Sequence, residues 1–343
     1  MTKKQLLSVL AAGIFLCGIV LMLLVVPSMN PGTTPTEPDD VSVTTTEDDT
    51  SVFVTDPPTE PPTDPPTEPP TYPPAETMPP ETLSLTAEYG FAYDCSTQRF
   101  LYIGGDPKAQ LAPASLTKLL TAYVVLEYMQ PDQIVTVGNE VTWIDPMSSI
   151  AFLQPGHKLT VEMLIQGLIM QSGNDAAYTL AVACGRQIAE DPQMDRRKAC
   201  DLFVAEMNAQ AKNLGMENTQ FKNPDGIDEA GHYTTVNDLV TLSLVVMENE
   251  VIMKYAGMAT ANVRFASGET CTWQNSNYLL HEDKSCFAPD AVGLKTGSTS
   301  GAGKCLISLF RREDGSHLMV GVLGSDTDDI RYTDTLILYN RYR

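Results

Sequence analysis

The chain has 343 residues, of which 43% are hydrophobic and 19% are charged, so it can form one or two domains with a sizeable core. Its formal net charge of −21 excludes a nucleic-acid partner, because binding to the phosphate backbone needs a basic surface. Residues 28–84 alone contain twelve acidic residues and no Lys or Arg. Because anionic lipid head groups repel acidic surfaces, any membrane attachment is expected at the N-terminal end.

Residues 1–27 predict a cytoplasmic tip followed by a signal-anchor transmembrane helix. Residues 6–27 are almost entirely apolar, and a helix of this length reaches about 33 Å, enough to cross a hydrocarbon core. Lys3 and Lys4 precede the apolar run, which favours a cytoplasmic N-terminus. A cleaved signal peptide is the alternative, although its apolar region is normally about 7–15 residues long. We therefore expect a single-pass protein of the cell membrane with an extracytoplasmic main domain.

Residues 28–84 predict an extended linker. Over residues 56–74 the sequence repeats a unit of one acidic residue, two prolines and a threonine. Proline fixes φ and lacks an N–H group, so this stretch cannot form a helix or a central strand. We expect polyproline II at about 3.1 Å per residue, which would hold the next domain away from the membrane.

Residues 85–343 predict one globular domain of the α+β class. Two apolar runs joined by a turn indicate a hairpin, helical patterns follow, and strand-like runs then precede a terminal helix from Asp326. This order favours an antiparallel β-sheet flanked by helices, with a helical subdomain, over alternating βαβ units. The expected strands are 88–95, 99–103, 291–295, 304–311 and 317–324, and the expected helices before the last are 115–128, 161–171, 176–184, 197–214 and 236–249.

The cysteines and histidines of this domain give no metal-binding pattern. No two cysteines form a C-x-x-C pair and no histidines form a His-Glu-x-x-His motif, so neither a zinc knuckle nor a zinc peptidase is expected. Disulfides and buried free thiols both remain open for the six cysteines. They are Cys95, Cys184, Cys200, Cys271, Cys286 and Cys305.

A first motif combines a serine and a lysine suited to acyl transfer. Pro113 suits the first turn of a helix, and Ser115 and Lys118 then lie three residues apart on one helical face. A serine hydroxyl needs a neighbouring base to become a nucleophile, and lysine can be that base when burial or a nearby cation favours its neutral form. Taken alone, the spacing is more typical of an N-cap serine beside a surface lysine.

A second motif, Ser172-Gly173-Asn174, follows the apolar helix expected at 161–171. Its hydroxyl can relay protons, and its amide can hold a substrate carbonyl and the lysine together. A turn between two helices, capped by Asn174 or Asp175, fits the same spacing.

A third motif, Lys295-Thr296-Gly297, is expected at the end of a strand. Lys295 can attract a substrate carboxylate, Thr296 can hydrogen-bond to it, and Gly297 lets the backbone approach a ligand closely. The alternative is a strand end followed by a polar turn.

The three motifs, in this order, resemble the signature of penicillin-binding proteins and serine β-lactamases. Over about residues 85–330 the sequence is similar to the low-molecular-mass D-alanyl-D-alanine carboxypeptidases. The stretches that carry the resemblance are 113–118, 172–177, 221–226, 233–235, 275–280 and 293–299.

The resemblance implies a helical part packed on an antiparallel sheet, with the site between them. It implies hydrolysis of D-Ala-D-Ala ends of peptidoglycan stem peptides through an acyl-enzyme, covalent inhibition by β-lactam antibiotics, and no cofactor. By position, Ser115 would be the nucleophile and Lys118 its base, while Ser172 and Asn174 would assist proton transfer and substrate placement.

The third motif would bind substrate. The resemblance implies that Lys295 and Thr296 meet the terminal carboxylate beside Gly297, and that the N–H groups of Ser115 and Ser298 form the oxyanion hole. The family usually has a larger residue where Ser298 stands, so a small one would open that side of the pocket.

Three other functions share this pattern. A D,D-endopeptidase that cuts cross-links is the nearest alternative, because the sequence does not decide how the pocket treats a free carboxylate. A class A β-lactamase also needs a Glu-x-x-x-Asn loop, which is not found between Asn174 and Lys295. A non-catalytic module that binds penicillin or the cell wall is the third alternative.

Overall fold

The computed structural model describes residues 83–343. The anchor expected at 1–27 and nearly all of the linker expected at 28–84 lie outside the described residues. Within residues 83–343, no helix combines the length and the apolar character needed to cross a membrane.

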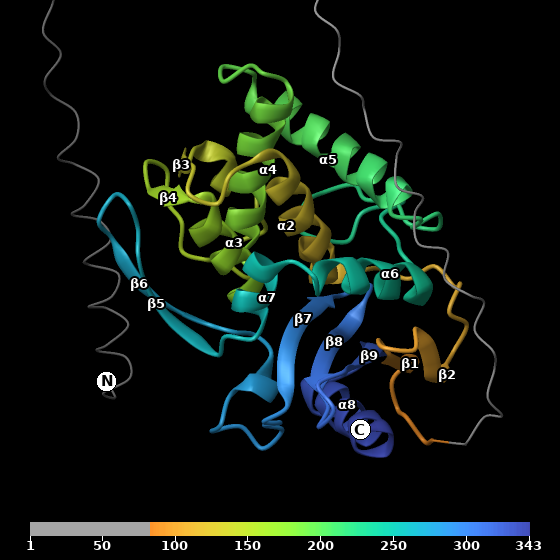
Figure 1. The fold of residues 1–343 in the computed structure, drawn as a ribbon. Helices are drawn as coiled ribbons and strands as arrows, with labels where there is room; N and C mark the ends of the chain where they lie inside the picture. Colours follow the sequence, from red (N-terminus) through yellow and green to blue (C-terminus); the bar gives the residue numbers. More distant parts are fainter. Residues whose placement is uncertain (1–82) are drawn as a thin grey trace, which may run out of the picture. The chain divides into compact units, whose positions relative to one another are not determined.

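Five strands form the main sheet of the described residues: β1 (Tyr89–Asp94), β2 (Arg99–Gly104), β7 (Ala291–Thr299), β8 (Gly303–Arg311) and β9 (His317–Ser325). They are antiparallel in the order β2-β1-β9-β8-β7, so the first and last strands pair although they are far apart in sequence (Figure 1). The Asp94 carboxylate closes the first hairpin by accepting hydrogen bonds from the N–H groups of Ser96 and Thr97.

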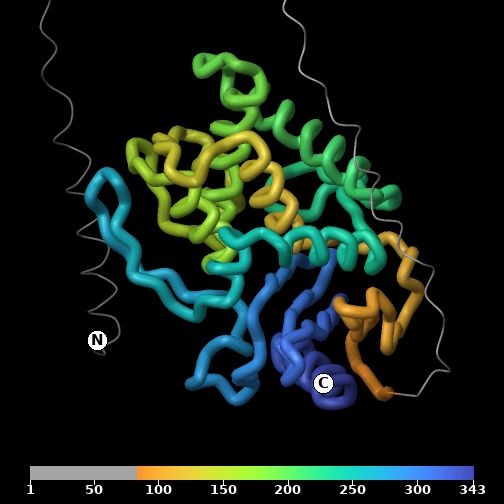
Figure 2. The backbone as a smooth tube through the Cα atoms, viewed as in Figure 1, coloured from red at the N-terminus to blue at the C-terminus, as the bar shows by residue number. Residues whose placement is uncertain are grey.

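Helices and two small two-stranded sheets, β3-β4 and β5-β6, occupy the chain between β2 and β7. Figures 1 and 2 show α2, α3, α4 and α5 gathered at one end of the sheet, whereas α8 lies along the sheet. The elements are η1 (Ala114–Leu116), α2 (Thr117–Tyr128), β3 (Ile134–Thr136), η2 (Asn139–Thr142), β4 (Lys158–Thr160), α3 (Val161–Met170), α4 (Asn174–Ile188), α5 (Arg196–Asn213), α6 (Val236–Val246), α7 (Glu250–Ala256), β5 (Thr260–Arg264), β6 (Thr270–Gln274), η3 (Tyr278–Leu280) and, after the sheet, α8 (Asp328–Tyr342).

Alternating side chains place the sheet between two cores. In β8, Ile307 and Leu309 join the core that the helical part shares with the sheet, whereas Leu306 and Phe310 join the core beneath α8. Successive side chains of a strand point to opposite faces, so a continuous apolar run is needed when both faces are covered. The expected fold class, an antiparallel sheet flanked by helices with a helical subdomain, is therefore confirmed.

Several boundaries differ from the sequence expectations. The strand expected at 291–295 continues to Thr299, because its ladder with β8 runs on until Thr299 faces Gly303. The third motif thus lies within a strand and not at its end. The helix expected at 236–249 ends at Val246, and α7 begins after Asn249, whose side chain accepts hydrogen bonds from two N–H groups of its first turn. The helix expected at 176–184 is longer and spans Asn174–Ile188.

The cysteines of the described residues are free thiols. Cys184, Cys200 and Cys305 are buried, and Cys95, Cys271 and Cys286 are half-buried. Burial raises the pKa of the Cys184 and Cys200 thiols to about 12, which disfavours the reactive thiolate. Of the two alternatives for these residues, free thiols are therefore confirmed.

Candidate active site

Ser115 and Lys118 are in direct contact. Ser115 lies in the η1 turn and Lys118 in the first turn of α2, and the Lys118 Nζ donates a hydrogen bond of 2.8 Å to the Ser115 Oγ. The same Nζ donates to the backbone carbonyl of Asp225 at 2.5 Å. Lys118 is 0% exposed, so the alternative of an N-cap serine beside a surface lysine is wrong.

Burial also sets the protonation of Lys118. Removal from water lowers its pKa to about 8, against the opposing charges of Asp225 and Asp175. At about pH 7 roughly a tenth of the amine is therefore neutral, which is the form that a general base requires. Burial raises the pKa of the Asp225 carboxyl, and the neighbouring Lys118 charge acts in the opposite direction.

One loop supports both residues from behind. Gly226, at φ 89°, lies so close to the η1 turn that a Cβ on it would be 1.9 Å from the Ala114 carbonyl oxygen, so only glycine fits. Further along the same loop, the Asp228 carboxylate accepts hydrogen bonds from the Thr299 hydroxyl at 2.6 Å and the Gly301 N–H at 2.7 Å. The loop thus connects the serine turn to the β7–β8 turn.

The second motif forms the turn between α3 and α4. Ser172 has a positive φ of 55°, Asn174 begins α4, and both side chains are buried. The neighbouring Asp175 is close enough for its charge to raise the pKa of Lys118, so this turn belongs to the same site. Within residues 83–343, no hydrogen bond joins the side chains of Ser172 or Asn174 to Lys118.

The third motif meets the serine turn along β7. A Cβ on Gly297 would be 3.2 Å from the Ser115 backbone nitrogen, so strand and turn are in backbone contact. Lys295 is 1% exposed, and its Nζ donates to the Thr296 carbonyl at 3.0 Å. Burial, followed by the charges of Lys118 and Arg331, lowers the Lys295 pKa well below its usual value. Ser298, the next residue after Gly297, is exposed.

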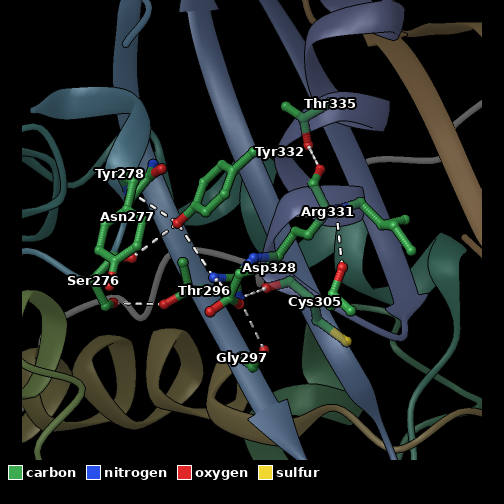
Figure 3. Close-up of polar contacts among 12 residues, drawn as sticks. Ser276, Asn277, Tyr278, Thr296, Gly297, Cys305, Asp328, Arg331, Tyr332 and Thr335 are labelled. Atoms are coloured by element: carbon green, nitrogen blue, oxygen red, sulfur yellow. Dashed lines mark hydrogen bonds and ion pairs between the residues drawn. The ribbon is translucent and has the colours of Figure 1, made fainter. Parts of the chain in front are cut away.

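Ser276 is a further hydroxyl that the sequence motifs did not single out. Its Oγ lies 2.5 Å from the Thr296 Oγ1 (Figure 3). Its backbone N–H donates to the Met170 carbonyl at 3.0 Å. Ser276 therefore links the end of α3, just before the second motif, to the third motif.

Arg331 of α8 is the other residue that sequence reasoning missed. Its guanidinium is buried and donates to the carbonyls of Cys305 at 3.2 Å and Gly297 at 3.4 Å, and it pairs with Asp328 at 2.9 Å (Figure 3). Its guanidinium adds a permanent positive charge to the side of the site that holds Lys295. An arginine one turn behind the acidic start of the terminal helix was the only sequence signal for this residue.

The arrangement combines a serine hydroxyl, a buried amine in contact with it, and a strand that carries a second buried lysine and is backed by Arg331. Such a set can attack a carbonyl group, take up the hydroxyl proton and attract a nearby carboxylate. Among the described residues, no group of three or more His, Cys, Asp or Glu side chains could hold a metal ion.

The fold and the meeting of the three motifs at one site are those of the penicillin-binding serine peptidases as a class. A family model described as D-alanyl-D-alanine carboxypeptidase matches residues 75–327. The chain belongs to this family, as its motifs led us to expect.

Curated relatives agree with this membership. The D-alanyl-D-alanine carboxypeptidase DacF of Bacillus subtilis is 31% identical over 222 residues, and DacC of Escherichia coli is 33% identical over 246 residues. These alignments cover 64% and 67% of this chain but only 52% and 55% of the relatives, so the chain spans about half the length of these proteins. The D-alanyl-D-alanine carboxypeptidase of Streptomyces sp. strain K15 is 32% identical, with 75% of this chain and 87% of the relative covered.

Solved structures share the fold. The Streptomyces K15 DD-transpeptidase superposes with a TM-score of 0.68 at 30% identity, covering 75% of this chain and 97% of that chain. Penicillin-binding protein D2 of Listeria monocytogenes, in its ampicillin-bound form, superposes with a TM-score of 0.61 at 28% identity, covering 76% and 98%.

Proposed function

We propose that the protein is a serine D,D-carboxypeptidase that removes the terminal D-Ala from peptidoglycan stem peptides through an acyl-enzyme on Ser115. The observation that carries this proposal is the 2.8 Å contact between the Ser115 hydroxyl and the fully buried amine of Lys118. The family to which the chain belongs supplies the substrate class.

The geometry supports a two-step reaction. Neutral Lys118 takes the hydroxyl proton while the Ser115 Oγ bonds to the carbonyl carbon of the penultimate D-Ala. The N–H groups of Ser115 and Ser298 would stabilise the resulting oxyanion, which then collapses and breaks the peptide bond. The leaving D-Ala nitrogen receives the proton, and a water molecule then hydrolyses the ester and restores Ser115. Ser172 and Asn174 would assist proton transfer and hold the substrate.

The carboxylate of the leaving D-Ala would lie at the cationic side of the site. The Arg331 guanidinium provides positive charge, the Lys295 amine provides hydrogen-bond donors, and the Thr296 hydroxyl lies beside them. β-Lactam antibiotics also present a carbonyl near a carboxylate, so we expect them to acylate Ser115 and remain bound. The ampicillin-bound form of the Listeria protein is consistent with this expectation.

We further propose that residues 1–27 anchor the protein in the cell membrane and that 28–84 hold the catalytic domain away from it. The apolar run, the preceding lysines and the proline-rich repeat support this arrangement. Recovery of the full chain in a membrane fraction, and release of its catalytic domain by protease added outside the cell, would test it. Recovery in the soluble fraction would contradict it.

Two measurements on the full chain test the activity. Brief exposure to benzylpenicillin should add one penicilloyl group in intact mass spectrometry, and the Ser115→Ala variant should show none. Ser300→Ala, which removes an exposed hydroxyl from the β7–β8 turn, is the matched control and should be acylated normally. The protein should also release D-Ala from a Lys-D-Ala-D-Ala peptide. An adduct that persists in Ser115→Ala would overturn the assignment.

A second candidate is transfer of the acyl group to an amine or cleavage of a cross-linked peptide. The solved structures with this fold include one described as a DD-transpeptidase, which motivates the alternative. Incubation with a pentapeptide, a cross-linked dimer and a pentapeptide plus a free amine acceptor, side by side, separates the outcomes. We expect free D-Ala without a transfer product, and monomers from the dimer would favour the endopeptidase.

A further inference from the structure

The Tyr332 hydroxyl lies at the junction of α8, the Ser276–Tyr278 segment and β7 (Figure 3). It donates to the Ser276 carbonyl at 3.0 Å and accepts from the Tyr278 N–H at 3.0 Å and from the Arg331 Nη2 at 3.3 Å. We propose that Tyr332 is a positioning residue for the substrate carboxylate, which acts by holding Ser276 and Arg331 beside Thr296. This inference rests on the proposed function.

The hydroxyl is fully used by these three hydrogen bonds. A phenol has one O–H to donate and can accept two hydrogen bonds, and Tyr332 makes all of them while only 5% exposed. Because the three partners lie on two separate segments, α8 and residues 276–278, the hydroxyl cannot move without breaking at least one hydrogen bond. It therefore fixes the distance between α8 and the segment that carries Ser276.

Ser276 is held from both sides by its backbone. Its N–H is bonded to the Met170 carbonyl and its own carbonyl to Tyr332, so the backbone position is determined and the side chain is directed to Thr296. The result is a pair of hydroxyls 2.5 Å apart, at the strand that the proposed function assigns to the carboxylate. Either hydroxyl can turn its proton to a bound carboxylate oxygen.

Arg331 is fixed by the same hydroxyl. Its Nη1 is engaged by the carbonyls of Gly297 and Cys305, while its Nη2 meets Asp328 and Tyr332. This guanidinium contributes the positive charge behind β7. Tyr332 thus connects the Ser276–Thr296 hydroxyl pair to the Arg331 guanidinium. In the described part of the chain it makes no hydrogen bond to Ser115 or Lys118.

The ring of Tyr332 is held independently of its hydroxyl. It stacks on Tyr278 with the ring centroids 5.5 Å apart and an interplanar angle of 17°. Tyr332→Phe therefore removes the hydroxyl and preserves the packing. Tyr339→Phe is the matched control, because Tyr339 lies on the same helix, stacks on Phe310 at 4.1 Å and donates its hydroxyl to Asp290 away from the site.

The experiment compares full-length wild type, Tyr332→Phe and Tyr339→Phe on two substrates, acetylated Lys-D-Ala-D-Ala and its C-terminal methyl ester. We expect Tyr332→Phe to raise KM for the free acid about 5- to 20-fold with kcat changed less than about 3-fold, as loss of one or two buried hydrogen bonds implies. KM for the ester should change less than about 2-fold, and Tyr339→Phe should match wild type on both. Melting temperatures of the variants check that each is folded.

A second set of variants follows the effect to Ser276. Ser276→Ala should raise KM for the free acid similarly, and Ser276→Thr should retain the wild-type KM. The double variant, Ser276→Ala with Tyr332→Phe, should raise this KM no more than the single variant with the larger effect. A Tyr332→Phe variant that behaves like Tyr339→Phe, or that loses the acid and the ester equally, would overturn the role of Tyr332 alone. A wild type that releases no D-Ala would overturn the proposed function and this role with it.

Discussion

Gly297 of β7 lies against Ser115 of the η1 turn, where a Cβ would be 3.2 Å from the Ser115 backbone nitrogen and 3.0 Å from the Ala114 Cβ. The sheet and the helical part therefore meet at the nucleophile, in close contact with the backbone of the serine turn. This contact places the strand that carries Lys295 and the serine–lysine pair within one site.

Gly297→Ala should separate β7 from the η1 turn that carries Ser115. The added methyl group must push β7 or the η1 turn outward by a few tenths of an ångström, which would misplace Ser115 relative to the strand. We expect the rate of acylation by benzylpenicillin to fall about 10-fold, since catalysis depends steeply on such distances. Ser300→Ala in the neighbouring turn should keep the wild-type rate, and an unchanged rate in Gly297→Ala would contradict the contact.

The pH dependence of kcat/KM should report Lys118. Because burial lowers its pKa to about 8 and the neutral amine is the base, activity should rise tenfold per pH unit below about pH 8 and then level off. Lys118→Arg keeps the charge but cannot act as a base, so it should lose activity by about 100-fold or more. Lys222→Arg on the exposed surface should be unaffected. A rising limb centred near pH 6 would argue for a different base.

Asp175→Asn should destabilise the fold near the second motif. The Asp175 carboxylate accepts three backbone hydrogen bonds, from the N–H groups of Ala151, Leu153 and Ala176. An amide presents N–H to at least one of these donors, so we expect a loss of about 1–3 kcal/mol in the free energy of unfolding by denaturant. Asp106→Asn, at an exposed turn where the carboxylate accepts one N–H bond, should cost less than about 0.5 kcal/mol. Equal losses of stability in Asp175→Asn and Asp106→Asn would show that the three hydrogen bonds to Asp175 do not stabilise the fold.

His232 should make the fold sensitive to acid. Its Nε2 lies 3.2 Å from the Thr117 Oγ1, and burial lowers its pKa from 6.5 to about 4. The unfolded chain therefore binds a proton at a higher pH than the folded chain, so stability falls as the pH drops from about 6.5 to about 4. The resulting loss in the free energy of unfolding amounts to roughly 3 kcal/mol.

The His232→Gln variant should lack this pH-dependent loss of stability. Its free energy of unfolding, measured by denaturant at several pH values, should fall less steeply than that of wild type between about pH 6.5 and 4. His157→Gln, in a surface turn, serves as the control and should follow wild type. Parallel curves for His232→Gln and wild type would show that His232 is not the group that titrates.

Much of the site was predictable from local sequence. The spacing of Ser115 and Lys118 requires only one helical turn to bring the two side chains together, and the apolar runs of β8 and β9 indicated strands. The ends of elements were less predictable. The extent of β7 depends on its ladder with β8, and the break before α7 depends on a side-chain cap at Asn249.

The sequence by itself indicated the fold class, through the order and periodicity of its elements, and the family, through the resemblance of its three motifs to a known signature. Only the tertiary structure decided that Lys118 is buried, that Gly297 touches the serine turn, and that Arg331 and Tyr332 stand behind β7. These contacts join residues separated by long stretches of chain. Their geometry depends on how the sheet, the helical part and α8 pack together, and no local pattern encodes that packing.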